Sequence, residues 1–145
     1  MTFLLDTNVI SEATRPKPDV AVLAFLHETD EESLYLSVIT LGELARGVAL
    51  APPGVRQAAL QAWLERDLRA RFQGRMLDVT ANVAQAWGEL LARRSQAGAT
   101  MPAVDGLLAA TALAHDKVLV TRNVRDFEGC GLAIFDPWTG RTIGR

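Results

Sequence analysis

The amino-acid sequence predicts a three-layer α/β/α fold around a central, mostly parallel β-sheet. Short apolar runs that have the composition of strands alternate with longer segments of helical periodicity. Strands and helices in alternation form βαβ units, in which the strands run parallel. The 145 residues match the size of one domain, about 100–150 residues, and no repeat or linker divides them. We therefore expect a single α/β domain over residues 1–145.

The expected strands are short apolar runs bounded by polar or turn-forming residues. Phe3–Leu5 is the first of them, and the segment LYLSVI is the second. Runs of this length and composition are typical of strands buried within a parallel sheet. The predicted strands lie at residues 3–5, 34–39, 76–79, 117–122 and 132–135.

The expected helices begin at polar capping residues. Asp19, Thr40 and Thr80 each precede apolar residues at helical spacing. Pro102 suits the first position of the helix PAVDGLLAATALAH. The predicted helices lie at residues 9–13, 19–26, 40–50, 54–72, 80–94 and 102–115. The segment NVRDFEGCG is expected to be a loop, and the last ten residues, DPWTGRTIGR, a short tail.

The composition is that of a globular protein and limits the kinds of function. Hydrophobic residues make up 49% of the chain, and no apolar run approaches the roughly 20 residues needed to span a bilayer. The only cysteine, Cys130, excludes an internal disulfide and a multi-cysteine zinc site. The first six residues include an acid and no basic residue, so we expect no signal peptide, no membrane partner and a cytoplasmic location.

Acidic side chains follow the predicted strands close to where each strand ends. Asp6 directly follows the first strand, and Glu43 lies one helical turn after the second. Asn123 and Asp126 follow the strand KVLVTR, and Asp105 lies in the first turn of a helix. Because the carboxyl ends of parallel strands meet at one edge of a sheet, where ligands bind, we expect these side chains to converge.

Each acid also has a purely structural explanation. Asp6 could cap a helix, and Thr40 with Glu43 has the spacing of a capping box. Asp105 could favour its helix dipole, and Asp126 could be a solvated loop residue. Taken singly, the structural explanation is favoured for Glu43 and Asp126. The structural and functional explanations are evenly balanced for Asp6 and Asp105. Together they favour function, because clustered carboxylates repel one another unless a cation neutralises them or their pKa values rise.

The donor types at this edge indicate which cation would bind. Oxygen ligands alone select hard cations such as Mg²⁺ or Mn²⁺ rather than zinc. His27 and His115 fall on or near predicted helix ends and are expected to play no part in the site. The sequence contains no GxGxxG or Walker loop, and no Ser-His-Asp or Cys-His set stands out. We therefore expect a magnesium or manganese site at the acidic edge.

Five segments occur in the order and spacing of PIN domains. They are LLDTNVISE, LSVITLGELARGV, PAVDGLLAATALAH, LVTRNVRDF and FDPW, and the resemblance extends from Phe3 to Trp138. More narrowly, the chain resembles the VapC-type toxins of bacterial type II toxin–antitoxin pairs, and among those the FitB-like branch. Each motif alone is weak, but five of them in order over one domain are specific.

This resemblance implies an activity and a set of partners. It implies a Mg²⁺- or Mn²⁺-dependent endoribonuclease toxin that cleaves RNA with metal-activated water and is held inactive by a cognate antitoxin. It also implies a homodimer, and contact with DNA only through the antitoxin. Arg46, Arg122 and Arg125 are candidates for contacts to the RNA backbone.

The functional residues of the family carry over position by position. Asp6 matches the first metal ligand, Glu43 the second acid, and Asp105 the third acid and a direct metal ligand. Glu43 would orient or deprotonate the attacking water. The usual place of the fourth acid holds Asn123, which is a departure from the family pattern. We expect Asn123 to act as a weaker fourth ligand and Asp126, three residues further on, to be nearly silent.

Two other functions are compatible with parts of this pattern. Phosphoryl transfer through an aspartyl phosphate would need a second acid two residues after Asp6, where Asn8 stands. A catalytically weak or inactive interaction module with the PIN fold gains support from Asn123 at the fourth acidic position. The presence of Asp6, Glu43 and Asp105 counts against the inactive module. Thr7, Asn8 and Thr121 match small polar residues that support the acids in PIN domains.

Overall fold

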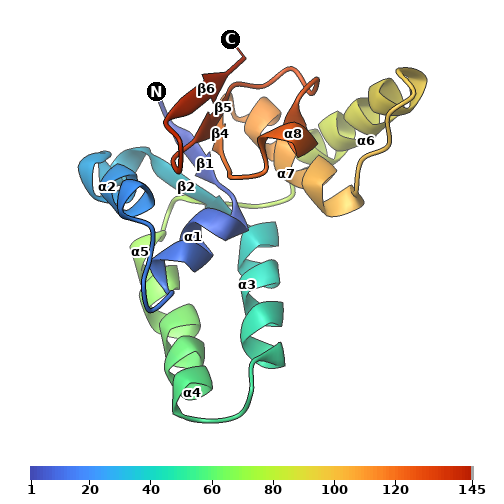
Figure 1. Ribbon diagram of the computed structural model, residues 1–145. Helices are drawn as coiled ribbons and strands as arrows, with labels where there is room; N and C mark the ends of the chain where they lie inside the picture. The colour runs from blue at the N-terminus through green and yellow to red at the C-terminus, as the bar shows by residue number, and fades with distance from the viewer. Residues whose placement is uncertain (145) are drawn as a thin grey trace.

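A six-stranded sheet lies at the centre of residues 1–144, the part of the chain that the computed structural model describes (Figure 1). Its strands follow the order β3-β2-β1-β4-β5-β6. Strands β1 to β5 run parallel to their neighbours, and β6 is antiparallel to β5. The strands are β1 (Phe3–Leu5), β2 (Leu34–Ser37), β3 (Met76–Leu77), β4 (Val118–Val120), β5 (Ile134–Asp136) and β6 (Arg141–Ile143).

Helices connect the strands, and polar residues begin several of them as predicted. The Asp19 side chain accepts hydrogen bonds from the amides of Ala21 and Val22, and the Thr80 side chain accepts one from Val83. Within residues 1–144, every helix is too short or too polar to span a membrane. The helices are α1 (Thr7–Ala13), α2 (Val20–Glu28), η1 (Glu31–Ser33), α3 (Val38–Leu50), α4 (Val55–Ala62), η2 (Trp63–Leu68), α5 (Arg69–Arg71), α6 (Ala81–Gln96), α7 (Ala103–Ala114) and α8 (Val124–Phe127).

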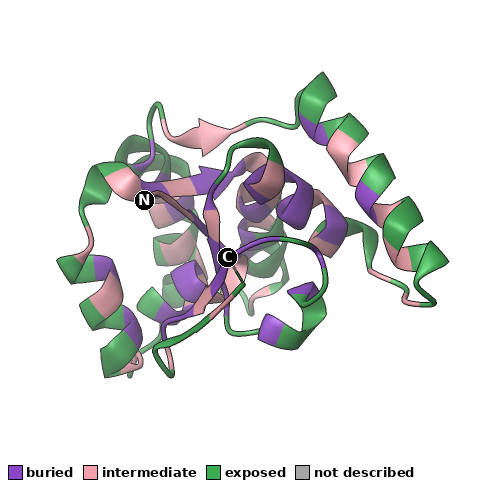
Figure 2. Ribbon diagram, turned by 90° about the horizontal axis from the view of Figure 1, so that it is seen from above, coloured by how far each residue is buried: buried purple, intermediate pink, exposed green. Residues whose placement is uncertain are grey.

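The two faces of the sheet bury two separate apolar clusters. In β1, Leu5 belongs to the cluster that includes residues of α1, α2, α3 and η2, whereas Leu4 belongs to the cluster that includes residues of α6, α7 and α8. Val120 and Leu119 alternate in the same way in β4. Buried residues run along the sheet, and the outer sides of the helices are exposed (Figure 2). The predicted three-layer α/β/α architecture is therefore confirmed.

The register of the two central strands decides what emerges at the carboxyl edge. Leu5 pairs with Val120, so the next residues, Asp6 and Thr121, leave the sheet as neighbours. The amide of Asp6 donates a hydrogen bond to the carbonyl of Val120 at 2.9 Å, which continues the pairing past the last strand residue. Two polar side chains from distant parts of the sequence are thereby placed together.

Among the differences between the structure and the predicted elements, three concern segments that follow a strand. The second strand ends at Ser37, whose hydroxyl caps α3, so that Val38 and Ile39 are helical. A short apolar run such as LYLSVI is compatible with both structures, which is why its periodicity did not reveal the boundary. The predicted loop after β4 contains the short helix α8, and the predicted C-terminal tail contains β6.

Replacement of Phe127 tests how α8 is held against the sheet. Phe127 is 1% exposed and belongs to the apolar cluster shared with α7. We expect Phe127→Ala to lower the free energy of unfolding by about 3–5 kcal/mol, because it removes a buried ring and leaves a cavity. Urea unfolding followed by circular dichroism measures the change, and Phe127→Leu should cost less. Wild-type stability in Phe127→Ala would contradict this packing.

Candidate metal centre at the carboxyl edge of the sheet

Asp6 is a buried carboxylate held by neighbours on two sides. It is 8% exposed and stands between β1 and α1. Its Oδ1 accepts a hydrogen bond from the amide of Thr7 at 2.7 Å, so Asp6 does cap α1. Its Oδ2 accepts hydrogen bonds from the hydroxyl of Thr121 at 2.8 Å and from the side-chain amide of Asn8 at 3.4 Å. Capping of α1 is thus compatible with a functional role for Asp6, because only Oδ1 caps the helix and Oδ2 has different hydrogen-bond partners.

Thr121 connects the ends of β1 and β4 through its hydroxyl. The side chain is fully buried, and its Oγ1 donates to Asp6 while accepting hydrogen bonds from the side chain of Asn8 at 3.4 Å and the amide of Asn123 at 3.0 Å. The Oδ1 of Asn8 accepts a hydrogen bond from the amide of Arg122 at 3.4 Å. These bonds fix the orientation of Asp6 and the start of the chain that leads into α8.

Glu43 is held by Thr7 rather than by a capping box. The hydroxyl of Thr7 donates a hydrogen bond of 2.6 Å to Oε1 of Glu43, and Glu43 is exposed. The capping-box alternative is wrong, because α3 begins at Val38 and its cap is Ser37. Thr40 lies inside the helix, and its buried hydroxyl has no hydrogen-bond partner among residues 1–144. The carboxylate of Glu43 is therefore held by Thr7, the residue that follows Asp6.

Asp105 reaches the same edge from the other layer. It lies in the first turn of α7 and is half-buried. The next residue, Gly106, allows α6 to approach closely, because an added Cβ would lie 3.0 Å from a methyl carbon of Leu91 and 3.1 Å from the ring of Trp87. The indole nitrogen of Trp87 also donates to the carbonyl of Ala103 at 3.2 Å. Packing against α6 thus sets the start of α7 and the position of Asp105.

The pKa values of two acids show that the carboxylates lie within electrostatic range of one another. Burial, opposed by hydrogen bonds from Thr121 and Thr7 and reinforced by the charges of Glu43 and Asp105, raises the pKa of Asp6 from 3.8 to about 6. Burial, followed by the charges of Asp126 and Glu43, raises the pKa of Asp105. The charges of Glu43 and Asp105 thus act on Asp6, and the charges of Asp126 and Glu43 act on Asp105.

Asn123 and Asp126 occupy different places in the segment after β4. Asn123 precedes α8, and its amide, not its side chain, makes the hydrogen bond to Thr121. Its side chain does not cap α8. Asp126 lies in α8, and its charge affects Asp105 more strongly than the charge of Glu43 does.

The acidic edge fits a hard divalent cation by its donor chemistry. Within residues 1–144, no group of three or more His, Cys, Asp or Glu side chains is arranged to hold a metal ion by itself. Magnesium does not require such a cage, because it commonly binds one or two carboxylates and completes its shell with water and substrate phosphate. Here each donor is an oxygen, and a cation would offset both the burial that chiefly raises the pKa of Asp6 and the smaller effect of the charges of Glu43 and Asp105.

The sequence did not reveal that the C-terminal segment borders this edge. A cavity of about 400 Å³ is lined by Asn123 and Asp126 and also by Asp136 and Arg141 of the β5–β6 hairpin. The signal that could have found it is Gly140, which follows an apolar strand and precedes Arg-Thr-Ile, a short run that can pair back.

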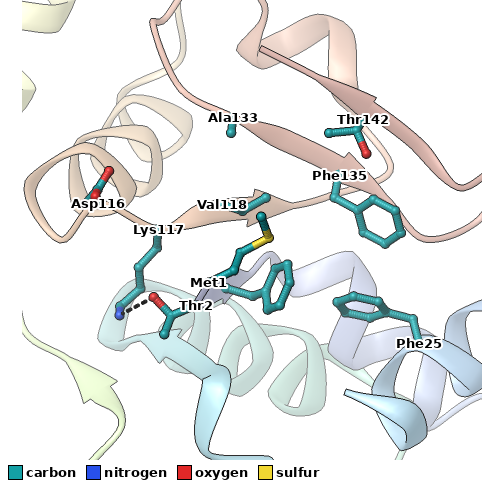
Figure 3. A pocket seen from close by; sticks show the side chains of 10 residues that line it. Met1, Thr2, Phe25, Asp116, Lys117, Val118, Ala133, Phe135 and Thr142 are labelled. Atoms are coloured by element: carbon teal, nitrogen blue, oxygen red, sulfur yellow. Dashed lines mark hydrogen bonds between the residues drawn. The ribbon is translucent and has the colours of Figure 1, made fainter. Parts of the chain in front are cut away.

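Another cavity, of about 500 Å³, lies at the opposite end of the sheet (Figure 3). Its lining includes Phe3, Phe25 and Phe135, and the ammonium group of Lys117 donates a hydrogen bond to the hydroxyl of Thr2 at 3.1 Å. Phe3 begins β1, whereas the acids follow the strand ends. None of the acids of the candidate centre lines this cavity, so it is separate from the centre.

The raised pKa of Asp6 makes the metal-free protein less stable as the pH rises. The folded protein binds the Asp6 proton more tightly than the unfolded chain, so no stability is lost below about pH 3.8 and the loss is complete above about pH 6. The difference of about two pH units corresponds to an upper bound of about 3 kcal/mol. We expect Asp6→Asn, which carries no charge, to lack this loss and to be more stable than wild type at pH 7.

Urea unfolding in EDTA between pH 4 and pH 8 measures this difference. Asp67→Asn is the matched control, because it removes a carboxylate from an exposed position in η2. Its stability difference from wild type should show no step between pH 4 and pH 6. The same pH dependence in wild type and Asp6→Asn would mean that Asp6 is not the responsible group.

Comparison with known proteins identifies the family of the chain. The model of the PIN domain family matches residues 3–129. This range contains β1 through α8 and every acid of the candidate centre, and it ends before β5 and β6.

Relatives with assigned names match almost the whole chain. The plasmid stability protein StbB of Pseudomonas syringae pv. tomato is 42% identical over 93% of this chain and 97% of its own length. The VapC ribonuclease Y4jK of Sinorhizobium fredii is 40% identical over 93% of this chain and 96% of its own. The toxin FitB of Neisseria gonorrhoeae is 39% identical over 93% and 97% of the two chains.

A solved structure has the same fold over nearly the same length. A chain in the structure of FitAB bound to an IR36 DNA fragment superposes with a TM-score of 0.90 and 37% identity, covering 94% of this chain and 96% of that one. The family match spans most of the sequence, and the relatives named above match it over more than nine tenths of its length. The chain therefore belongs to the PIN domain family.

Proposed function

We propose that the protein is a metal-dependent endoribonuclease, the toxin of a type II toxin–antitoxin pair. The observation that carries the proposal is the buried carboxylate of Asp6 at the edge of the sheet, which Thr121 orients and which Thr7 joins to Glu43, with Asp105 close enough for its charge to raise the pKa of Asp6. The names of two relatives, a VapC ribonuclease and the toxin FitB, support the same activity. A single PIN domain over residues 1–145 would account for this activity, although Arg145 lies outside the described residues.

The proposed cofactor is Mg²⁺ or Mn²⁺, held by Asp6, Asp105 and Glu43. A bound divalent ion would lower the pKa of a water molecule and offset the charge of the scissile phosphate. Asp6 suits an anchoring role, because it is buried and its orientation is fixed by Thr121. Asp105 is half-buried at a helix start that α6 holds in place, so it can bind without rearrangement of its backbone.

Glu43 suits the handling of the attacking water. It is exposed to solvent, and the hydroxyl of Thr7 occupies one of its oxygens, which leaves the other free to orient a water or accept its proton. A base must lie within hydrogen-bond reach of the proton it takes, and the tether to Thr7 keeps Glu43 beside Asp6. Arg46, Arg122 and Arg125 remain the proposed contacts to RNA phosphates.

The proposed partners follow from the relatives. FitAB has been solved bound to DNA, and by analogy an antitoxin would hold this protein inactive and make the contacts to DNA. We also propose a homodimer and a cytoplasmic location, where an RNA substrate would be met. The alternative, a weak or inactive PIN-fold module, is supported by Asn123 at the usual position of the fourth acid.

Cleavage assays with antitoxin-free protein test the proposed activity. We expect single-stranded RNA to be cleaved with Mg²⁺ or Mn²⁺, and Asp6→Asn, Glu43→Gln and Asp105→Asn each to lower the rate by roughly 100-fold or more. Each change keeps the size of the side chain and removes its charge. Gel analysis of a labelled RNA measures the rate, and Asp67→Asn is the control.

Two outcomes would count against this activity, and a third would count against the role of Glu43. Undiminished cleavage in excess EDTA would exclude the metal-dependent reaction. Absence of any cleavage by wild type, with metal bound in a calorimetric titration, would favour the inactive module. Full activity in Glu43→Gln would show that the carboxylate charge of Glu43 is not needed.

The fourth acidic position can be assigned by two substitutions. The sequence favoured Asn123 as a weaker ligand, but the effect of Asp126 on the pKa of Asp105 supports Asp126 as the fourth acid. We expect Asp126→Asn to reduce cleavage about as strongly as Asp105→Asn, and Asn123→Asp to change it little. The metal concentration that gives half-maximal cleavage is the measurement. A silent Asp126→Asn together with tighter Mg²⁺ binding in Asn123→Asp would restore the original assignment.

A further inference from the structure

The cavity beside the acidic edge gathers three arginines from separate segments. Arg122 follows β4, Arg125 lies in α8 and Arg141 begins β6, and all three line the cavity of about 400 Å³. Asn123 lines the same cavity, and its amide donates a hydrogen bond of 3.0 Å to the hydroxyl of Thr121, which donates one of 2.8 Å to Asp6. The cavity therefore borders the candidate metal centre.

In the part of the chain that the structure describes, the three guanidinium groups have no carboxylate partners. Within residues 1–144, the ion pairs join Arg15 to Glu12, and Arg71 and Arg75 to Glu31. No carboxylate oxygen of the described residues is therefore within 4 Å of the three arginines that line the cavity. An arginine fork binds carboxylate or phosphate with two parallel hydrogen bonds, so three unpaired forks around one cavity form a site for an anion.

The β5–β6 hairpin holds Arg141 in a defined position. Asp136 pairs directly with Arg141 across the two strands. Oδ1 of Asp136 accepts a hydrogen bond from the amide of Trp138 at 2.8 Å, and its carbonyl accepts one from Gly140 at 2.8 Å. Gly140 has φ of 77°, a left-handed conformation that side chains other than that of glycine rarely adopt. The carboxylate of Asp136 thus serves the turn and does not pair with Arg141.

An aromatic ring borders the same site. The guanidinium carbon of Arg122 lies 5.1 Å from the centre of the Trp138 ring, so the tryptophan orients an arginine that has no ion-pair partner among the described residues. Trp138 is partly buried against the core, which restricts its movement. Aromatic and guanidinium planes next to unpaired positive charge are typical of sites for single-stranded nucleic acid.

We propose that this cavity binds one nucleotide of the RNA substrate adjacent to the cleaved bond, with its phosphate held by Arg122, Arg125 and Arg141. The inference rests on the proposed ribonuclease activity. It assigns a substrate contact to the β5–β6 hairpin, which lies beyond the residues matched by the family model. Two carboxylates line the cavity: Asp126 lies in α8, and Asp136 is 8% exposed and bonded to the turn.

Binding of RNA without cleavage is the first test. A fluorescein-labelled single-stranded RNA is titrated in EDTA against the full chain and its variants. Arg141→Gln and Arg125→Gln should each weaken binding about tenfold, because each removes a charge-assisted contact. Each should also lower the slope of log affinity against log salt by about 0.7, the value for one phosphate contact on a single strand. Arg69→Gln, which changes an exposed arginine in α5, should alter neither quantity.

Two features of the design keep the binding result interpretable. Arg125 lies in α8 and Arg141 in β6, so damage to the hairpin in one variant leaves the other informative. Urea unfolding of all three variants confirms that they fold. Binding by both Arg125→Gln and Arg141→Gln within twofold of Arg69→Gln would overturn the proposal.

Cleavage kinetics separate this site from the proposed activity. With Mg²⁺, Arg141→Gln should raise KM with kcat nearly unchanged, because the contact is present before and during the reaction. Among RNAs shortened from either end, there should be one length at which wild type and Arg141→Gln have the same KM. If wild type cleaves and Arg141→Gln matches it at every length, the activity stands and the nucleotide site fails. Weakened binding in a protein that cleaves no RNA would support the site and reject the activity.

Discussion

The hydrogen bond from Thr121 to Asp6 is the interaction on which the rest of the candidate centre depends. It joins the ends of the two central strands, β1 and β4, at 2.8 Å in a fully buried position. Asn8 bonds to both residues, and the amide of Asn123 bonds to the same hydroxyl of Thr121. The orientation of Asp6 and the path of the chain toward α8 are thus set by one buried network.

The centre combines side chains from both layers that enclose the sheet. Asp6 directly precedes α1 and Glu43 lies in α3, whereas Asp105 and Asp126 come from α7 and α8. Helices α3 and α4 form an arm that projects away from the sheet, whereas α7 and α8 pack on the opposite layer (Figure 1). Because the acids belong to separately packed elements, the layers must pack correctly before the carboxylates meet. Their repulsion is then a cost of folding that a divalent cation would remove.

Several features could be predicted from the sequence because they depend on local residue patterns. The alternation of apolar runs and helical segments indicated a mostly parallel sheet, and capping at Asp19 and Thr80 marked two helix starts correctly. The acids after the first two strands and at the start of α7 were identified because parallel strands place their carboxyl ends at one edge. The boundary at Ser37 was missed, because the apolar run at residues 34–39 is compatible with both a strand and a helix.

The sequence by itself determined the fold class, the family motifs and the identity of the acids, because these follow from residue types at fixed spacing. Only the tertiary structure decided what those acids touch. Glu43 has the spacing of a capping residue, yet it bonds to Thr7, thirty-six positions away, because α3 begins earlier than its cap pattern indicated. The tail became β6 because it pairs with β5, and that pairing places Arg141 beside Asp126. Contacts between distant segments depend on strand register and layer packing, which local patterns do not specify.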